Sequence, residues 1–303
     1  MGRATRTDRF WRVLEGARAR RGVALMGICN VTPDSFSDGG RYFSPAEAQA
    51  RIRALLDEGA DFIDVGGEST RPGAPSVPAA EQLARVLGAI AYATELGACV
   101  SIDTASSEVA IQCLEAGACI VNDVSCLRDE ELASACASRE APLVLMHSRE
   151  PMSELQGFSA YPDDAYGDVV RDVIAEWNAA AERAASRGLG RGSLVMDPGL
   201  GFAKNGRQSM ALLAATGTIA ETVGVPVCVG ASRKSFLVAN EPASKRAKPD
   251  DRVGASVAAA VFAARHGAAV LRVHDVRATA QAIDLDRVLA GDRGRRRREE
   301  GAG

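Results

Sequence analysis

The stretch GADFIDVGGE, residues 59–68, contains the pattern that decides the fold: a glycine and an alanine followed directly by a short apolar run. The same pattern returns as GACVSIDT at 97–104, GACIVND at 117–123 and GAAVLRVHD at 267–275. Glycine just after a helix adopts the left-handed conformation at low steric cost, so each pair marks the end of a helix. Short runs that are apolar on both faces are typical of buried parallel strands. The repeat therefore predicts helices that alternate with buried parallel strands.

Working outward from these repeats, we predict eight strands separated by helical patterns. The strands are expected at residues 23–28, 62–66, 99–103, 119–123, 142–147, 194–197, 226–230 and 269–274. Helices are expected after the capping box that begins at Ser44, and at 78–96, 106–116, 129–139, 165–186, 208–222, 250–266 and 277–290. Eight such units over about 270 residues predict a (β/α)8 TIM barrel, an α/β fold with its active site at the C-terminal ends of the strands. An open doubly wound sheet is the alternative, but no Gly-rich dinucleotide motif follows the first strand.

The barrel pattern covers residues 22–290 of the 303-residue chain, and arginine-rich segments flank it. We expect a basic N-terminal segment at 1–21 and a solvated, disordered tail at 291–303. A basic arm that contacts nucleic acid is the alternative for these ends, but we favour the solvated interpretation and expect no nucleic-acid partner. No apolar run of about 18 residues or more is present, so no membrane span is expected. The seven cysteines have no metal-binding spacing, which indicates free thiols in the cytoplasm.

Every predicted strand ends in polar or ionisable residues, which should converge at one end of the barrel. These residues are Asn30, Glu68, Asp103, Asn122, Asp123, His147, Asp197, Lys234, Arg272 and His274, with their direct neighbours. Any one of the aspartates or asparagines could instead be a helix N-cap. As a set, however, buried carboxylates and amides need hydrogen-bond partners. A flat heterocycle rich in donors and acceptors would supply them.

Four side chains at or after strand ends form a second, cationic group. They are Arg71, Lys234, Arg272 and His274. Together with Asn30 and nearby backbone amides, they have the composition of an anion site. A structural salt bridge for Arg272 and a buried structural role for His274 are the alternatives.

Two loops rich in Gly, Pro, Ser and Asp, at 32–44 and 69–78, follow the first two strands and are expected to be mobile. The first contains Phe36 and Phe43 within polar sequence. An aromatic side chain in a flexible lid often covers an aromatic substrate, and ordinary loop packing is the alternative.

Two other kinds of catalytic site fit the sequence less well. Cys126 follows the fourth strand, but no matched base accompanies it, as a nucleophile would require. Asp103 and Asp197 could act as the paired carboxylates of a glycosidase, but this leaves the cationic group without a role. The strand ends therefore predict a pocket for a flat polar ring and an anion.

Several stretches resemble the motifs of dihydropteroate synthases, in the order of that family. MGICNVTPDSFSDGG at 26–40 resembles the first motif, and GADFIDVGGESTRPG at 59–73 resembles the second. The stretches SIDT, VNDVS, LMH, DPGLGFAKN, GASRKSFL and RVHDV follow. The resemblance covers residues 22–290, and its first two motifs are long and specific. This sequence differs from the residues that are common in the family at positions 148–151, Leu200, Ala203 and Cys29.

The resemblance implies a site that binds dihydropterin deep inside the barrel. The residues that would bind the pterin ring are Asp103, Asn122, Met146, Asp197 and Lys234. Those that would bind pyrophosphate are Asn30, Arg71, Arg272 and His274, with Mg²⁺ near Asn30. The p-aminobenzoate site would comprise Phe36, Thr70, Pro72, Phe202 and Ser235. Catalysis would rest on Arg71, Asp103, Arg272 and His274.

By this resemblance the chain would be a transferase of folate biosynthesis. It would condense 6-hydroxymethyl-7,8-dihydropterin pyrophosphate with p-aminobenzoate to give 7,8-dihydropteroate and pyrophosphate. The family also implies Mg²⁺, a cytoplasmic homodimer and inhibition by sulfonamides. A pterin-binding methyltransferase domain and a catalytically silent pterin-binding paralogue are the alternatives. The loops at 32–44 and 69–78 argue against the first, and the intact cationic group argues against the second.

Overall fold

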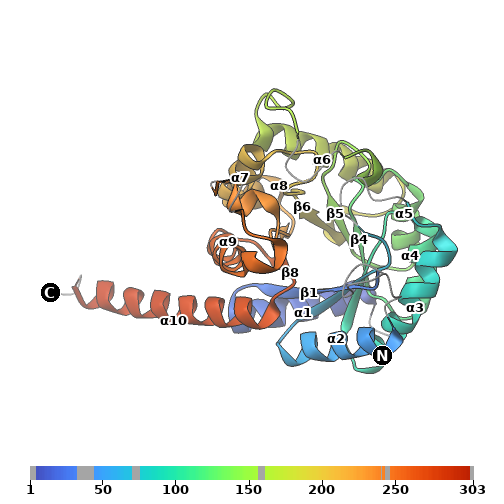
Figure 1. Cartoon of the computed structure of the whole chain (residues 1–303), viewed down its shortest axis with the longest axis horizontal. Coiled ribbons are helices and arrows are strands. Elements are labelled where there is room, and N and C mark those ends of the chain that lie inside the picture. The colour runs from blue at the N-terminus through green and yellow to red at the C-terminus, as the bar shows by residue number, and fades with distance from the viewer. Residues whose placement is uncertain are drawn as a thin grey trace.

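The structure is a computed structural model that describes residues 5–32, 44–69, 76–155, 161–239, 241–242 and 246–300, with the backbone alone for 292–300. Within these ranges, eight parallel strands form a barrel and helices surround it (Figure 1). The strands are β1 Ala24–Asn30, β2 Phe62–Gly66, β3 Cys99–Asp103, β4 Ile120–Asp123, β5 Leu143–Met146, β6 Leu194–Asp197, β7 Cys228–Val229 and β8 Val270–Val273. Strand β1 pairs with both β2 and β8, and a bridge between Met196 and Val227 links β6 to the start of β7. The predicted (β/α)8 barrel is confirmed.

Helices follow the strands close to where the sequence patterns predicted them, with two differences that are described below. They are α2 Pro45–Asp57, α3 Ala79–Glu95, α4 Ser107–Glu115, α5 Glu131–Ser138, α6 Val169–Ser186, α7 Gly206–Ala214, α8 Thr216–Val223, α9 Val253–Arg265 and α10 Val276–Glu300. Ser44 and Glu47 form the predicted capping box at the start of α2. The glycines of the four Gly-Ala pairs all have positive φ, between 79° and 114°. The repeat therefore marks helix ends, as predicted.

Two helical segments differ from the prediction. The pattern at 208–222 predicted one helix, but the structure divides it into α7 and α8. The break falls where the hydroxyl of Thr216 donates to the carbonyl of Leu213 at 2.7 Å, a local bond that competes with the helix ladder. Helix α10 runs beyond residue 290 and extends away from the barrel (Figure 1), where the sequence predicted disorder. No proline interrupts that segment, and arginine and glutamate are good helix formers.

The N-terminal segment forms a helix, α1 Arg6–Arg21, that closes one end of the barrel. Phe10, Leu14 and Ala17 are buried on its inner face and pack against the first residues of several strands. The ring of Phe10 stacks on Phe62 of β2, with 5.5 Å between the centroids. Because these strand residues lie at the N-terminal ends, α1 covers the end opposite the predicted active site. Among the described residues, no helix is long and apolar enough to cross a membrane.

Arginines of α1 bind the ends of the neighbouring helices. Arg6 donates three hydrogen bonds, of 2.8 to 3.1 Å, to the carbonyl oxygens of Leu114 in the last turn of α4, Ala118 just before β4, and Arg139 at the end of α5. Arg9 donates two, of 2.7 and 3.0 Å, to carbonyls after α3. Cations at these positions are favourable because the last carbonyls of a helix lack partners and carry partial negative charge. Much of the basic character of this segment therefore serves the fold.

Replacing Arg6 with alanine is expected to lower the free energy of unfolding by about 1.5–3 kcal/mol, because it leaves several helix-terminal carbonyls without a charged donor. Urea denaturation measures the change. Arg12→Ala is the matched control, because Arg12 is exposed on the same helix; it should change stability by about 0.5 kcal/mol or less. Equal denaturation midpoints for the two variants would contradict the capping role of Arg6.

Candidate active site

The C-terminal ends of the strands open into a pocket of about 850 Å³. The predicted residues that line it are Asn30, Phe202, Lys234, Ser235, Arg272 and His274. They come from the end of β1, the loop after β6, the loop after β7, and β8 with its following loop. The structure therefore brings these side chains together at the end of the barrel that the sequence predicted. Their roles in binding stay predictions.

Arg272 joins two buried carboxylates inside the barrel. Its Nε lies 2.6 Å from Oδ2 of Asp64, and its Nη2 lies 2.6 Å from Oδ2 of Asp103. The amide of Asn122 also donates to Oδ2 of Asp64, at 3.3 Å. Within the described part of the chain, Oδ1 of Asp64 and Oδ1 of Asp103 are buried without a hydrogen-bond partner. A buried acceptor without a partner is costly, so these oxygens are available to a ligand.

Burial and the neighbouring charges have opposing effects on the pKa values of Asp103 and Arg272. Burial raises the pKa of Asp103 to about 7; Arg272 opposes this rise and the negative charge of Asp64 adds to it. Burial disfavours the charged form of Arg272, but the two carboxylates raise its pKa, so the guanidinium remains charged. The strand-end pattern includes Asp103 and Arg272 but not Asp64, which lies in the middle of β2. The sequence feature that could have identified Asp64 is a charged residue in the middle of the apolar strand at 62–66.

Asp197 and Lys234 form a second pair of opposite charges. Oδ1 of Asp197 accepts from the backbone N–H of Gly199 at 2.7 Å. The ammonium group of Lys234 donates to the carbonyl of Leu200 at 2.5 Å and lies 4.2 Å from the centre of the Phe202 ring. Burial lowers the pKa of Lys234 to about 8, and Asp197 opposes this change. Burial raises the pKa of Asp197, and Lys234 opposes that change in turn.

Two glycines lie beside several of the predicted residues. A Cβ atom built on Gly66 would lie 3.4 Å from Oδ1 of Asn30 and 3.5 Å from Cβ of Asp103. A Cβ atom on Gly230 would lie 3.6 Å from Oδ2 of Asp197. The side chains predicted to bind an anion and those predicted to bind a ring therefore border one site.

The other predicted residues fall into two groups. Met146 is buried and packs in one apolar cluster with Phe202. The remaining four lie outside the described residues, as does most of both predicted loops: they are Phe36, Thr70, Arg71 and Pro72.

His274 lies at the pocket, but it does not carry the charge that the sequence analysis assigned to it. Its Nδ1 lies 3.0 Å from Oγ of Ser232, and its backbone N–H donates to the same oxygen at 3.2 Å. Burial, with the charges of Arg233 and Arg272, lowers the pKa of His274 to about 3. The prediction of a cationic His274 is therefore wrong for the free protein, because burial among arginines favours the neutral ring. Its contact with pyrophosphate stays a prediction.

A buried network that the sequence analysis did not predict holds the loop after β6. Nζ of Lys204 lies 2.9 Å from Nδ1 of His147 and donates to the carbonyl of Phe202 at 2.9 Å. Nε2 of His147 lies 2.9 Å from Oε2 of Glu176 on α6. The network thus joins β5, α6 and the loop that carries Phe202. Two sequence features could have indicated this network: His147, whose role the sequence left open, and the lysine of DPGLGFAKN.

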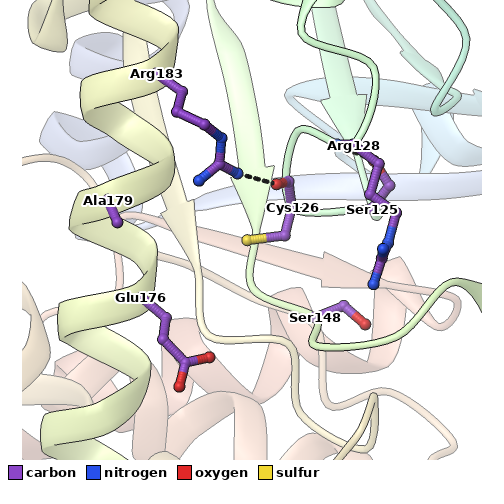
Figure 2. A pocket seen from close by; sticks show the side chains of 7 residues that line it. All are labelled: Ser125, Cys126, Arg128, Ser148, Glu176, Ala179 and Arg183. Atoms are coloured by element: carbon purple, nitrogen blue, oxygen red, sulfur yellow. Dashed lines mark hydrogen bonds between the residues drawn. The ribbon is translucent and has the colours of Figure 1, made fainter.

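A second pocket, of about 280 Å³, lies between α6 and the loop after β4 (Figure 2). The thiol of Cys126 points into it, and Arg183 donates to the Cys126 carbonyl at 2.9 Å. Burial raises the pKa of this thiol, which keeps it protonated. Glu176 also lines the pocket, but it is held by His147 and Arg149. This arrangement argues against Cys126 as a nucleophile.

Comparison with known proteins places the chain among pterin-binding enzymes. A sequence profile of the family described as "Pterin binding enzyme" matches residues 26–274. The dihydropteroate synthase of Mycobacterium leprae is 44% identical over 267 residues, which cover 87% of this chain and 92% of that protein. A Haloferax volcanii protein named "Probable bifunctional folylpolyglutamate synthase/dihydropteroate synthase" is 42% identical over 270 residues, which cover 87% of this chain. The chain spans only 30% of that bifunctional relative.

Solved structures agree with this comparison. A Xanthomonas albilineans dihydropteroate synthase with 4-aminobenzoic acid is 40% identical, with a TM-score of 0.78 over 88% of this chain and 93% of that one. The same enzyme in complex with 7,8-dihydropteroate gives 36% identity and a TM-score of 0.75, over 88% and 94%. A Yersinia pestis dihydropteroate synthase with a sulfonamide drug gives 36% identity and a TM-score of 0.80, over 89% and 94%.

Proposed function

The chain belongs to the dihydropteroate synthase family of pterin-binding enzymes, and we propose that it condenses 6-hydroxymethyl-7,8-dihydropterin pyrophosphate with p-aminobenzoate. It is a transferase of folate biosynthesis, and its products would be 7,8-dihydropteroate and pyrophosphate. One observation carries this proposal: Arg272, a fixed guanidinium that suits an anion, lines the pocket and binds two buried carboxylates, each with one oxygen that lacks a partner among the described residues and suits a polar ring. The ligands of the Xanthomonas albilineans structures support the same substrates.

The pterin ring would be bound by buried polar side chains inside the barrel. The residues proposed for this role are Asp103, Asn122, Met146, Asp197 and Lys234. Carboxylates accept from ring and amino N–H groups, and an ammonium donates to a ring oxygen or nitrogen. Among the described residues, the oxygens of Asp64 and Asp103 that lack partners support such a ligand.

The pyrophosphate and p-aminobenzoate would lie nearer the opening. The residues proposed for pyrophosphate are Asn30, Arg71, Arg272 and His274. Arg272 is held by its two carboxylates before any substrate arrives, and such preorganisation favours transition-state stabilisation. The residues proposed for p-aminobenzoate are Phe36, Thr70, Pro72, Phe202 and Ser235. Of these, Phe202 contacts Lys234, which would set the two substrates side by side.

The reaction replaces pyrophosphate by an aromatic amine at the exocyclic methylene carbon of the pterin. A new C–N bond forms as the C–O bond to pyrophosphate breaks, and the amine nitrogen then releases a proton to water. The amine is uncharged near neutral pH, so no strong general base is required. Arg272 would stabilise the negative charge that develops on the leaving group. The carboxylates of Asp103 and Asp197 would stabilise the positive charge that develops on the pterin.

We propose Mg²⁺ as the cofactor, with Asn30 as its ligand from the protein. The described residues contain no group of three or more His, Cys, Asp or Glu side chains that could hold a metal ion. Mg²⁺ is often bound by one or two protein groups and by substrate phosphates, so an amide oxygen beside the pyrophosphate fits this mode. Bound there, the ion would neutralise charge on the leaving group.

Removal of divalent cations is therefore expected to abolish turnover, and added Mg²⁺ is expected to restore it. The measurement is pyrophosphate release in excess chelator, before and after addition of the metal. Full activity in the chelator would contradict the proposed cofactor.

The affinity for the pterin ring is expected to rise about tenfold between about pH 6 and pH 8. Asp103 has its pKa raised to about 7, and only its ionised form offers both oxygens as acceptors. The contribution of Asp103 to the stability of the folded protein changes with pH in the opposite direction to the pterin affinity. The folded pKa lies above the usual 3.8, so this group stabilises the fold at low pH and the contribution is lost as pH rises through about 7. Calorimetric titration across this range, with Asp103→Asn as the control, measures the affinity. A pH dependence that persists in the variant would assign it to another group.

One assay tests the proposed function against its alternatives. The purified protein is incubated with the pterin pyrophosphate, p-aminobenzoate and Mg²⁺, and pyrophosphate release is followed together with 7,8-dihydropteroate. Release that requires p-aminobenzoate supports the proposal. A methyltransferase domain or a silent paralogue would bind the pterin without coupled release, and that result would overturn the proposal.

We also propose a cytoplasmic homodimer that sulfonamides inhibit. Seven free cysteines, six of them buried, suit a reducing compartment.

Leu285 and Val288 on α10 are 61% and 70% exposed, and a second copy would cover apolar side chains of this kind. Sedimentation at micromolar concentration would test the dimer, and a monomeric mass would contradict it. Inhibition that is independent of the p-aminobenzoate concentration would contradict competition by sulfonamides.

A further inference from the structure

We propose that Ser232 is a positioning residue that fixes the His274 ring with Nδ1 as a hydrogen-bond acceptor and Nε2–H as a donor. The proposal rests on the proposed function, because the donor would serve the departing pyrophosphate. Ser232 contacts the His274 ring and would affect the reaction only through the orientation of that ring.

The hydrogen bonds of the Ser232 hydroxyl lead to this assignment. Its oxygen accepts from the backbone N–H of His274 at 3.2 Å, a group that can only donate. The same oxygen lies 3.0 Å from Nδ1 of the ring. If Nδ1 carried the proton, the buried hydroxyl would accept twice, and its own proton would have no acceptor among the described residues. With Nδ1 unprotonated, the hydroxyl proton has an acceptor in Nδ1, and the backbone N–H of His274 keeps its acceptor in the Ser232 oxygen.

Neighbouring contacts hold this pair in place. Arg233, next to Ser232, binds Asp275, next to His274, through two hydrogen bonds of 2.7 and 3.0 Å. The carbonyl of His274 accepts from Arg51 at 2.6 Å. Arg233 has φ of 61°, and such backbone strain persists where the surroundings determine the conformation. The loops after β7 and β8 are therefore joined at two successive positions.

This arrangement gives His274 a defined chemical role. A neutral ring with Nδ1 occupied can present only Nε2–H, and the ring lines the same pocket as Arg272 and Asn30. Among the described residues, Nε2 makes no hydrogen bond, so it can donate to an oxygen of the leaving pyrophosphate. Arg272 would then supply the charge and His274 a directed hydrogen bond. No proton has to change place for this role.

Nitrogen NMR of the imidazole rings tests the assignment without any substrate. The chain has only three histidines, so His147→Gln and His266→Gln variants identify the signals of His274. We expect the Nε2–H form in the wild-type protein and in Ser232→Thr, and a mixture of both tautomers in Ser232→Ala. Wild-type protein in the Nδ1–H form would overturn the proposal, whatever the variants do.

Kinetics then test the consequence of the tautomer. Ser232→Ala is expected to lower kcat by up to roughly tenfold, the scale of one neutral hydrogen bond, with little change in KM for p-aminobenzoate. Ser232→Thr should retain most of kcat, and Ser186→Ala, on the exposed end of α6, is the matched control. In a His274→Gln background, Ser232→Ala should have no further effect; an equal loss there would overturn the proposal. Absence of pyrophosphate release by the wild-type protein would instead refute the proposed function and leave the tautomer measurable.

Discussion

Replacing Arg272 with methionine is expected to lower kcat by about a hundredfold or more and to destabilise the folded protein at neutral pH. Arg272 lies 2.6 Å from each of two buried carboxylates, those of Asp64 and Asp103. Removing one partner of such a buried group leaves charge uncompensated, which costs about 3–5 kcal/mol. The same guanidinium lines the pocket, and loss of one preorganised donor to a developing anion lowers kcat by about 10²–10³.

A second substitution separates the two effects. Asp64→Asn removes one of the two carboxylates, so the combined variant should be more stable than Arg272→Met alone while its kcat stays low. Urea denaturation and pyrophosphate release measure these quantities. Arg265→Met is the matched control, because its ion pair with Asp286 is at the surface, where such pairs contribute about 1 kcal/mol or less. Normal kcat in a folded Arg272→Met protein would show that Arg272 takes no part in departure of the leaving group.

The barrel could be predicted because its signals are local. Each Gly-Ala pair combines a helix end with the start of an apolar strand, and both depend on neighbouring residues alone. Once eight such units are counted, the fold places residues such as Asn30, Lys234 and Arg272 at the same end of the barrel. The pocket therefore follows from topology, and its lining confirms that these side chains converge.

The partners of the site residues could not be predicted in the same way. Arg272 and Asp64 lie 208 positions apart, and no residue near either of them specifies the other. The neutral state of His274 depends on burial and on charges from separate loops, which no local pattern reports. The arginines of the N-terminal segment are visible in the sequence, but the narrow apolar stripe of Phe10, Leu14 and Ala17, which packs the same segment against the barrel, was not predicted.

Replacing Asp197 with alanine is expected to weaken binding of the pterin ring by about one to two orders of magnitude. Asp197 is buried at the end of β6, beside the ammonium group of Lys234. Its carboxylate would accept a charge-assisted hydrogen bond from the ring, and loss of such a bond costs roughly 1.5–3 kcal/mol. Calorimetric titration with a dihydropterin that lacks the pyrophosphate measures the contribution of the ring alone.

Asp197 also supports its surroundings, so a direct contact with the ring has to be distinguished from an effect on the loop. Its Oδ1 accepts from Gly199, and its charge opposes the lowering of the Lys234 pKa by burial. Asp197→Asn keeps an acceptor for Gly199 and removes only the charge. If Asp197 binds the ring directly, both variants should lose affinity, and the alanine variant should lose more. If Asp197 acts only through its hydrogen bond with Gly199, the asparagine variant should bind the pterin normally. Unchanged affinity in a folded Asp197→Ala protein would remove Asp197 from the ring site altogether.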